Sequence, residues 1–219
     1  MDAMFAFNRM GGTMKTTKTL AWLLGATIAL AGCGDKGTET SSTGSATPEA
    51  GKKLKIAVIP KGSTHEFWKS IHEGANEAAS ELGNVEIIWK GPLKEDDRND
   101  QIKVVEDFTT QGVDGIVLAP LDDKALARPV MDAKNSGIPT VIIDSDLKDA
   151  ETVSFVATDN YKGGETAGEE MAKLLGDKGK IVVLRYAEGS ASTNFREQGF
   201  IDAIKKHSGI TIVSENRYA

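Results

Sequence analysis

From residue 54 onward, short apolar runs alternate with longer stretches in which apolar and polar residues recur at helical spacing. Most of the short runs are nearly all apolar, which is typical of strands covered on both faces. They predict strands over residues 55–60, 85–89, 115–119, 140–144, 153–157, 180–185 and 211–214. The amphipathic stretches predict helices over residues 66–82, 99–111, 124–135, 161–175 and 193–206.

Three of the predicted helices are closely followed by glycines, namely Gly83, Gly112 and Gly137. Glycine is favoured there because it adopts the left-handed conformation that ends many helices. Alternating strands and helices predict right-handed βαβ units and an α/β fold with doubly wound parallel sheets. In such sheets ligands bind beyond the carboxyl ends of the strands. The residues directly after each strand are therefore the candidates for function.

The N-terminal segment is typical of an export signal rather than of a folded domain. Lys15 and Lys18 precede an apolar run over residues 20–31, and a Leu-Ala-Gly-Cys motif closes the run. The run is shorter than the roughly 20 apolar residues that a membrane-spanning helix needs. We predict a signal peptide with a lipoprotein cleavage pattern over residues 1–33, with translation starting at Met14.

Cys33 is the only cysteine of the chain, which excludes an intrachain disulfide and a metal cluster of several cysteines. We predict that it becomes the lipidated first residue of the mature protein and anchors it to a membrane of the cell envelope. Alternatively, it is a small residue near an ordinary signal-peptide cut. Residues 34–53 lack large apolar side chains and predict a flexible linker.

The chain is acidic, with 26 Lys and Arg against 32 Asp and Glu and a formal net charge of −6. The predicted signal peptide is itself basic, so the remainder is more acidic still. This balance argues against nucleic acid or an anionic membrane surface as the partner, and it leaves a small ligand or another protein.

The first predicted strand is followed by residues suited to a small polar ligand. No glycine-rich nucleotide motif stands here. Lys61, Ser63 and His65 can bond hydroxyl groups, and Phe67 and Trp68 can stack on the apolar face of a sugar. The alternative is that the two aromatic residues belong to the core of the first helical turn. His65 has no second histidine at the spacing of a zinc-protease motif, and no metal or cofactor is predicted.

Later strand ends add further candidates. The charged loop over residues 95–98 is either a solvated surface or a secondary ligand contact. Asp144 and Asp146 follow the fourth strand, and carboxylates accept hydrogen bonds from sugar hydroxyls or help to bind a cation. After the fifth strand, Thr158 or Asp159 is expected to cap the next helix. Asn160, next in the chain, joins the predicted ligand-binding set.

Arg196 is predicted to lie in the first turn of the last helix. A cation is unfavourable near a helix N-terminus, so a ligand or a carboxylate should compensate it. The alternative is an ordinary surface ion pair.

These segments, in this order, resemble the ribose-binding branch of the type I periplasmic binding proteins, from about Lys55 to Tyr218. The most specific segments occur in the same order along the chain as they do in members of the family. They are Ile56-Ala57-Val58-Ile59-Pro60 with Phe67-Trp68, Gly112-Val113-Asp114-Gly115-Ile116, Gly137-Ile138-Pro139, Ala157-Thr158-Asp159-Asn160, and Arg196 four residues before Phe200.

The resemblance implies two Rossmann-like lobes that close on a monosaccharide, with the first crossover near residues 157–160. It implies that Phe67 and Trp68 stack on the sugar, and that His65 makes a polar contact. It also implies that Asp144 bonds sugar hydroxyls and that Arg196 contributes from the second lobe. The predicted lobes are residues 54–157 and residues 158–219, the second of them incomplete because family members continue further.

Ribose binders usually carry arginine directly after the aspartate that Asp144 matches, and here Ser145 stands in that place. The Pro60-Lys61 and Asp144-Ser145-Asp146 segments are more similar to relatives that bind rhamnose or autoinducer-2. The sequence is therefore interpreted as a sugar-binding lipoprotein that serves the membrane permease of an ABC transporter. A sensor or chemotaxis component on the same fold is the alternative. An exported enzyme is disfavoured because no nucleophile with a base is found, and a related repressor because a signal replaces its DNA-binding headpiece.

Overall fold

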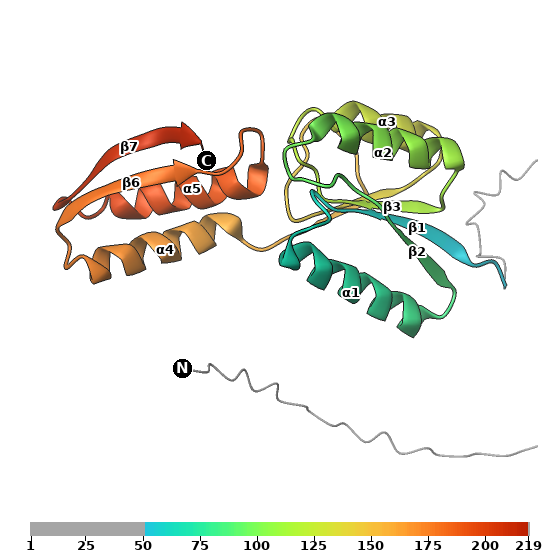
Figure 1. The fold of residues 1–219 in the computed structure, drawn as a ribbon, viewed down its shortest axis with the longest axis horizontal. Helices are drawn as coiled ribbons and strands as arrows, with labels where there is room; N and C mark the ends of the chain where they lie inside the picture. Colours follow the sequence, from blue (N-terminus) through green and yellow to red (C-terminus); the bar gives the residue numbers. More distant parts are fainter. Residues whose placement is uncertain (1–50, 219) are drawn as a thin grey trace, which may run out of the picture. The chain divides into compact units, whose positions relative to one another are not determined.

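The computed structural model describes residues 51–218, in which strands and helices alternate along the chain (Figure 1). The elements are β1 (Leu54–Ile59), α1 (Glu66–Leu82), β2 (Val85–Trp89), α2 (Arg98–Gln111), β3 (Gly115–Leu118), α3 (Ala127–Asn135), β4 (Thr140–Ile143), β5 (Ser154–Val156), α4 (Asn160–Leu174), β6 (Gly179–Arg185), α5 (Ala191–Ile204) and β7 (Ile210–Tyr218). Both sheets are parallel, so the predicted α/β class is confirmed.

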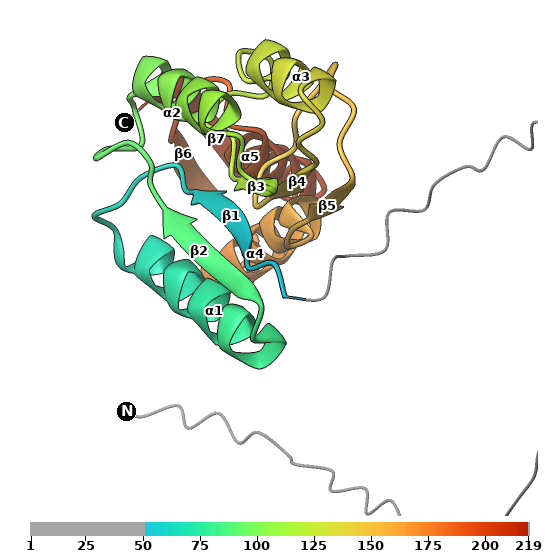
Figure 2. The same cartoon turned by 90° about the vertical axis from the view of Figure 1, so that its right-hand side faces the viewer.

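The first sheet has five parallel strands in the order β2-β1-β3-β4-β5. Chain order reverses at β1, which has β2 on one side and β3 on the other. Helix α1 covers one face, and α2 and α3 cover the opposite face (Figures 1 and 2). The sheet is therefore doubly wound, and its switch point lies at the carboxyl ends of β1 and β3, where ligand sites are expected.

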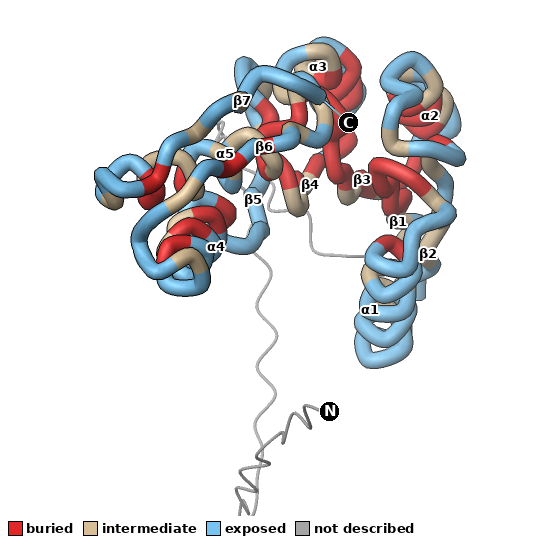
Figure 3. The backbone as a smooth tube through the Cα atoms, turned by 60° about the vertical axis from the view of Figure 1, so that its left-hand side comes forward, coloured by how far each residue is buried: buried red, intermediate tan, exposed pale blue. Residues whose placement is uncertain are grey.

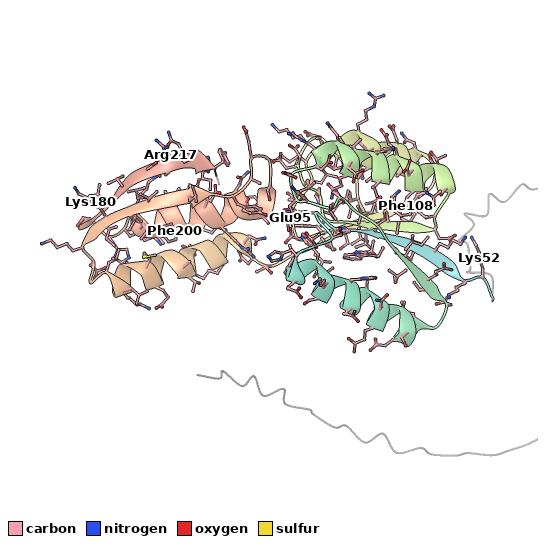
Figure 4. All side chains as sticks on the ribbon, viewed as in Figure 1. Lys52, Glu95, Phe108, Lys180, Phe200 and Arg217 are labelled. Atoms are coloured by element: carbon pink, nitrogen blue, oxygen red, sulfur yellow. The ribbon has the colours of Figure 1, made fainter. Side chains whose placement is uncertain are left out.

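The core of this sheet lies mainly under α2 and α3, and Figure 3 shows buried backbone concentrated in β1, β3 and β4. Phe108 of α2 is 1% exposed and fills the space between that helix and the strands (Figure 4). On the other face, Trp68 is the buried residue of α1. The better-covered face thus anchors the sheet, while α1 contributes one large side chain close to the strand ends.

Several helix ends follow the signals read from the sequence. Gly83 and Gly112 end α1 and α2 with φ angles of 75° and 66°. Asp159 caps α4 by accepting a hydrogen bond from the Lys162 amide, which confirms one of the two predicted caps. His65 is the N-cap of α1, a role that the sequence reading did not include.

The second sheet consists of β6 and β7, with α4 and α5 packed closely together on one face (Figure 1). Ile181 and Val183 of β6 point into the small core and are each 9% exposed, whereas Val182 and Leu184 are 61% and 63% exposed. The expectation that most strands are covered on both faces is therefore wrong for β6. It is also wrong for β5, whose three residues are all exposed.

Some boundaries differ from those predicted, and local contacts explain each difference. Strand β7 continues to Tyr218, because Arg217 and Tyr218 pair with Leu184 and Arg185 although the extension is polar. Helix α3 begins later than predicted, because Asp122 holds the amides of Lys124 and Ala125 in a turn.

The predicted signal peptide, Cys33 and most of the predicted linker lie outside the described residues. No helix within residues 51–218 is long and apolar enough to cross a membrane.

Candidate functional site

A cavity of about 360 Å³ opens at the carboxyl ends of β1, β4 and β6. The residues that line it follow these strands, lie in the first turns of the helices α1 and α5, or, for Glu95, lie in the loop between β2 and α2. They are Lys61, His65, Phe67, Trp68, Glu95, Asp144, Tyr186, Ser190, Ser192, Thr193 and Arg196. This is where ligand sites are expected in a parallel sheet. The cavity gathers Lys61, His65, Phe67, Trp68, Asp144 and Arg196 from the predicted set, and Ser63 is not among its lining residues.

Lys61 directly follows Pro60 after β1, and it is 4% exposed. Its Nζ lies 2.8 Å from Oδ2 of Asp144 and 2.6 Å from Oγ of Ser145. The same Nζ lies 3.1 Å from the hydroxyls of both Ser190 and Ser192. An ammonium group has three hydrogens, and here four protein oxygens surround it. The charge is therefore neutralised and solvated by the protein itself, as burial of an ammonium requires.

The lysine network joins the two sheets of the described chain. Asp144 and Ser145 follow β4 of the first sheet, whereas Ser190 and Ser192 stand at the start of α5, after β6 of the second. Ser145 adds a direct link, because its Oγ donates to Oγ of Ser192 at 2.8 Å and accepts from the Ser192 amide at 3.1 Å. Ser145, the residue that departs from the ribose-binder pattern, is 1% exposed. Its hydroxyl group forms hydrogen bonds with Lys61 and Ser192 of the protein itself.

Asp144 adopts a left-handed backbone conformation, with a φ angle of 63°. Aspartate tolerates this region better than most residues. Its amide donates to the Val156 carbonyl at 3.0 Å, so the end of β4 stays tied to β5 while the chain turns. Oδ2 accepts from Lys61 and, at 3.4 Å, from the Ser192 hydroxyl. The turn places the carboxylate in the cavity wall with one oxygen engaged by these partners.

The aromatic pair forms another part of the wall. Trp68 is 2% exposed, and its Nε1 donates to Oε1 of Glu95 at 2.6 Å. Phe67 is 46% exposed and meets the Trp68 ring edge-on, with ring centroids 4.8 Å apart. The two readings of this pair are therefore not exclusive, because Trp68 is buried in the protein and also lines the cavity.

His65 and Ser63 have different surroundings. The Nδ1 atom of His65 accepts a hydrogen bond from the Phe67 amide at 3.2 Å, which satisfies a free donor at the start of α1. If the imidazole is neutral, this bond places its proton on Nε2. His65 therefore both caps the helix and lines the cavity, while Ser63 is half-buried beside it.

Arg196 lines the cavity from α5, but it does not lie in the first turn of the helix. The helix begins at Ala191 rather than at residue 193, so Arg196 is in the second turn, and the predicted conflict with the helix dipole is wrong. Within residues 51–218 its guanidinium makes no ion pair or hydrogen bond, which also argues against the surface ion-pair alternative. Its donors are free to reach a ligand.

Asp146 and Asn160 lie in a neighbouring pocket of about 240 Å³ that shares Asp144 and Ser192 with the main cavity. Asp146 accepts a hydrogen bond from the Leu147 amide. Asn160 is 7% exposed; its Nδ2 donates to the Asp144 carbonyl at 3.4 Å, and its buried Oδ1 has no partner in the described chain. All the predicted site residues except Ser63 thus line one or both of these two adjoining pockets.

Sequence reasoning did not include Tyr186, Ser190, Ser192 and Thr193 in the site, and it left open whether the loop with Glu95 is a solvated surface or a secondary ligand contact. All follow strand ends, so the strand-end rule applied evenly would have included them. Partial burial, followed by the charge of Glu95, raises the pKa of the Tyr186 phenol above its usual value. The phenol therefore remains a hydrogen-bond donor at neutral pH.

The groups around the main cavity are suited to binding an uncharged polar molecule. Two cations, Lys61 and Arg196, balance two carboxylates, Asp144 and Glu95, and an aromatic surface stands beside them. Within the described residues, no cluster of His, Cys, Asp or Glu is arranged to hold a metal ion. A small ligand with several hydroxyl groups and one apolar face fits this chemistry.

Comparisons with known proteins agree on one family. A family model described as "Periplasmic binding protein domain" matches residues 56–219. The chain is 30% identical to the ribose import binding protein of Escherichia coli over 176 residues, which are 78% of this chain and 57% of that protein. It is 33% identical to the D-ribose/D-allose-binding protein of Pseudomonas aeruginosa over 175 residues, covering 77% of this chain and 54% of that protein.

Among solved structures, the chain is similar to an ABC transporter solute-binding protein from Agrobacterium vitis with bound D-fucose. The TM-score is 0.71 and the identity 40%, over 74% of this chain and 57% of that one. The chain thus spans 54–57% of the length of the two curated relatives. These relatives are named as binding proteins rather than enzymes, which agrees with the predicted non-enzymatic function.

Proposed function

The chain belongs to the periplasmic binding protein family, and on that premise we propose that it binds a monosaccharide for uptake by an ABC transporter. The similar proteins named above support this assignment, because each is named for a sugar or bears one. In this proposal residues 54–157 belong to one lobe and residues 158–219 to a second, and the ligand lies between the two lobes. Closure of the lobes around the sugar signals the loaded state to the membrane permease.

One observation carries the proposal, which is that Trp68, Asp144 and Arg196 meet in a single cavity although they are far apart in sequence. An aromatic face, a carboxylate acceptor and a guanidinium that has no partner within residues 51–218 are complementary to a sugar ring and its hydroxyls. In this assignment Trp68 and Phe67 contact the ring, while Asp144 and Arg196 bond hydroxyl groups.

The nature of the sugar follows from the departure at Ser145. An arginine there would add a donor to the ligand, whereas Ser145 is turned into the lysine network. We therefore expect a sugar with fewer hydroxyl contacts at this position than ribose has in its binders. One candidate is a 6-deoxyhexose such as rhamnose or fucose, which carries a methyl group where a hexose has its sixth hydroxyl, in line with the D-fucose bound to the A. vitis relative.

Isothermal titration calorimetry against D-ribose, D-arabinose, D-fucose and L-rhamnose tests the proposal. At least one sugar should bind, and Asp144→Ala should weaken its binding by roughly a hundredfold, because loss of a charged hydrogen-bonding partner costs several kcal/mol. Asp96→Ala, an exposed site in a neighbouring loop, should leave the affinity unchanged. The assignment fails if none of the sugars binds, or if Asp144→Ala binds as the wild type does.

Export and anchoring form a separate part of the proposal, in which residues 1–33 direct export, Cys33 carries the lipid and residues 34–53 tether the folded part. A single acyl chain binds membranes only marginally, so firm anchoring requires more than one chain. Cys33→Ala should leave the protein either unprocessed or free of the membrane fraction after cell fractionation. Membrane partitioning equal to that of the wild type would contradict lipidation.

A further inference from the structure

Glu95 lies in the loop between β2 and α2 (Figure 4), and both of its carboxylate oxygens accept hydrogen bonds from residues of the cavity wall. Oε1 accepts from Nε1 of Trp68 at 2.6 Å, and Oε2 accepts from the Tyr186 hydroxyl at 3.2 Å. Trp68 belongs to α1 beside the first sheet, whereas Tyr186 directly follows β6 of the second sheet. One side chain therefore connects the aromatic wall to the opposite half of the cavity.

The position of Glu95 is built into the packing of the loop. A Cβ atom at Gly62 would lie 2.9 Å from Cγ of Glu95 and 3.3 Å from its amide nitrogen, so only glycine leaves room for this loop. The Thr64 hydroxyl donates to the Leu93 carbonyl at 3.2 Å, which is a second contact between this loop and the segment after β1. The glutamate is thus fixed against the segment that follows β1.

Trp68 depends on this carboxylate. The indole is 2% exposed, so a missing partner would leave its N–H buried and unsatisfied. Hydrogen bonds to a charged acceptor are stronger and shorter than those between neutral groups, as the 2.6 Å distance illustrates. The bond therefore fixes the rotation of the indole and the plane that it presents to the cavity.

We propose that Glu95 is a positioning residue of the binding site, which holds the Trp68 ring in place and ties it to Tyr186 across the cavity. The proposal rests on the proposed function, in which Trp68 contacts the sugar ring. A ring that is already oriented loses less conformational entropy when the ligand binds, so preorganisation raises affinity. Glu95 thereby controls affinity through Trp68, without itself needing to contact the ligand.

Two measurements separate this role from general stability. The first is acrylamide quenching of Trp68 fluorescence without sugar, in the full chain with Trp22 and Trp89 changed to phenylalanine. The second is the sugar dissociation constant, measured by calorimetry in the otherwise unchanged chain. Glu95→Ala, Glu95→Gln and Tyr186→Phe are compared, with Asp96→Ala as the matched control in the same loop.

Glu95→Ala should increase quenching of Trp68 about twofold and raise the dissociation constant about tenfold, the size of one lost hydrogen bond. Glu95→Gln should restore both values to within about threefold of the wild type, because the amide oxygen still accepts from the indole. Tyr186→Phe should leave quenching unchanged and raise the dissociation constant only about threefold, since it removes only the bond across the cavity. Asp96→Ala should change neither value.

The proposal is overturned if Glu95→Ala leaves Trp68 quenching as it is in the wild type, or if Glu95→Gln is as damaging as Glu95→Ala. If the wild type binds no sugar, the proposed function fails, and the quenching comparison alone decides the role of Glu95. If Glu95→Ala does not fold, Gly62→Ala supplies the second test. Its added methyl group displaces Glu95 and should raise quenching of Trp68, and an unchanged value would contradict the proposal.

Discussion

Replacing Lys61 with methionine tests whether the buried ammonium network holds the two sheets together. The side chain of Lys61 is 5% exposed and that of its ion-pair partner Asp144 is 20% exposed, so both charges are largely removed from water. Lys61→Met keeps most of the volume but leaves the carboxylate without its cation. Removing one partner of a buried ion pair costs about 3–5 kcal/mol, and the residual exposure of Asp144 favours the lower end.

We therefore expect Lys61→Met to lower the free energy of unfolding by about 3 kcal/mol, measured by urea denaturation followed by circular dichroism. Adding Asp144→Asn to Lys61→Met should recover part of this loss, because the uncompensated charge is then gone. The control is Lys69→Met, which removes an ion pair with Glu66 whose lysine side chain is 58% exposed. That change should stay within about 0.5 kcal/mol.

The reasoning is refuted if Lys61→Met unfolds at the same urea concentration as Lys69→Met. It is also refuted if adding Asp144→Asn makes Lys61→Met still less stable, because the loss would then come from packing rather than from an unpaired charge.

Two further predictions concern helix packing and pH. Gly164→Ala should destabilise the chain by at least about 2 kcal/mol in urea denaturation, because its Cβ would lie 2.0 Å from the Arg196 carbonyl oxygen. Gly163 has open space around it, so Gly163→Ala should stabilise α4 by up to about 1 kcal/mol. Equal changes in unfolding free energy for the two variants would refute this account. Burial alone would raise the pKa of Asp122, but the amides of Ala125 and Lys124, with Arg98, lower it overall. The stabilisation that the Asp122 carboxylate contributes is therefore fully present above the ordinary aspartate pKa of about 3.9, and it is lost as pH falls through the lower folded-state pKa. Asp122→Asn should thus be less stable than the wild type at neutral pH. The difference in unfolding free energy should disappear in acid.

The order and type of the elements could be predicted from sequence because local signals agree with the final packing. Val85–Trp89 and Glu66–Leu82 were predicted with the bounds that the structure has. Predictions were wrong where tertiary pairing overrides local preference, as in β7, whose polar end is held by pairing with β6. They were also wrong where apolar composition was equated with burial, as in β6, which is covered on one face only.

Part of the site could be predicted, because side chains after parallel strands meet at one edge of the sheet. The partners of those side chains could not be predicted, since they depend on distances between segments far apart in sequence. The sequence predicts that Lys61 bonds hydroxyl groups of a ligand. In the structure it bonds the hydroxyl groups of the protein's own Ser145, Ser190 and Ser192. Three short hydroxyl side chains have no sequence pattern of their own, and only the fold brings them to one ammonium.

The contacts of Glu95 could not be predicted for the same reason, and its loop stayed open between a solvated surface and a secondary ligand contact. A run of five consecutive charged residues, here Lys94 to Arg98, is usually solvated, and Asp96, Asp97 and Arg98 are indeed exposed. Glu95 differs because the absence of a side chain at Gly62 lets the loop approach the end of β1, where the buried indole of Trp68 requires an acceptor. The role of Glu95 therefore depends on Gly62, because a side chain at position 62 would keep the loop away from Trp68. The two positions have to be considered together to predict this role.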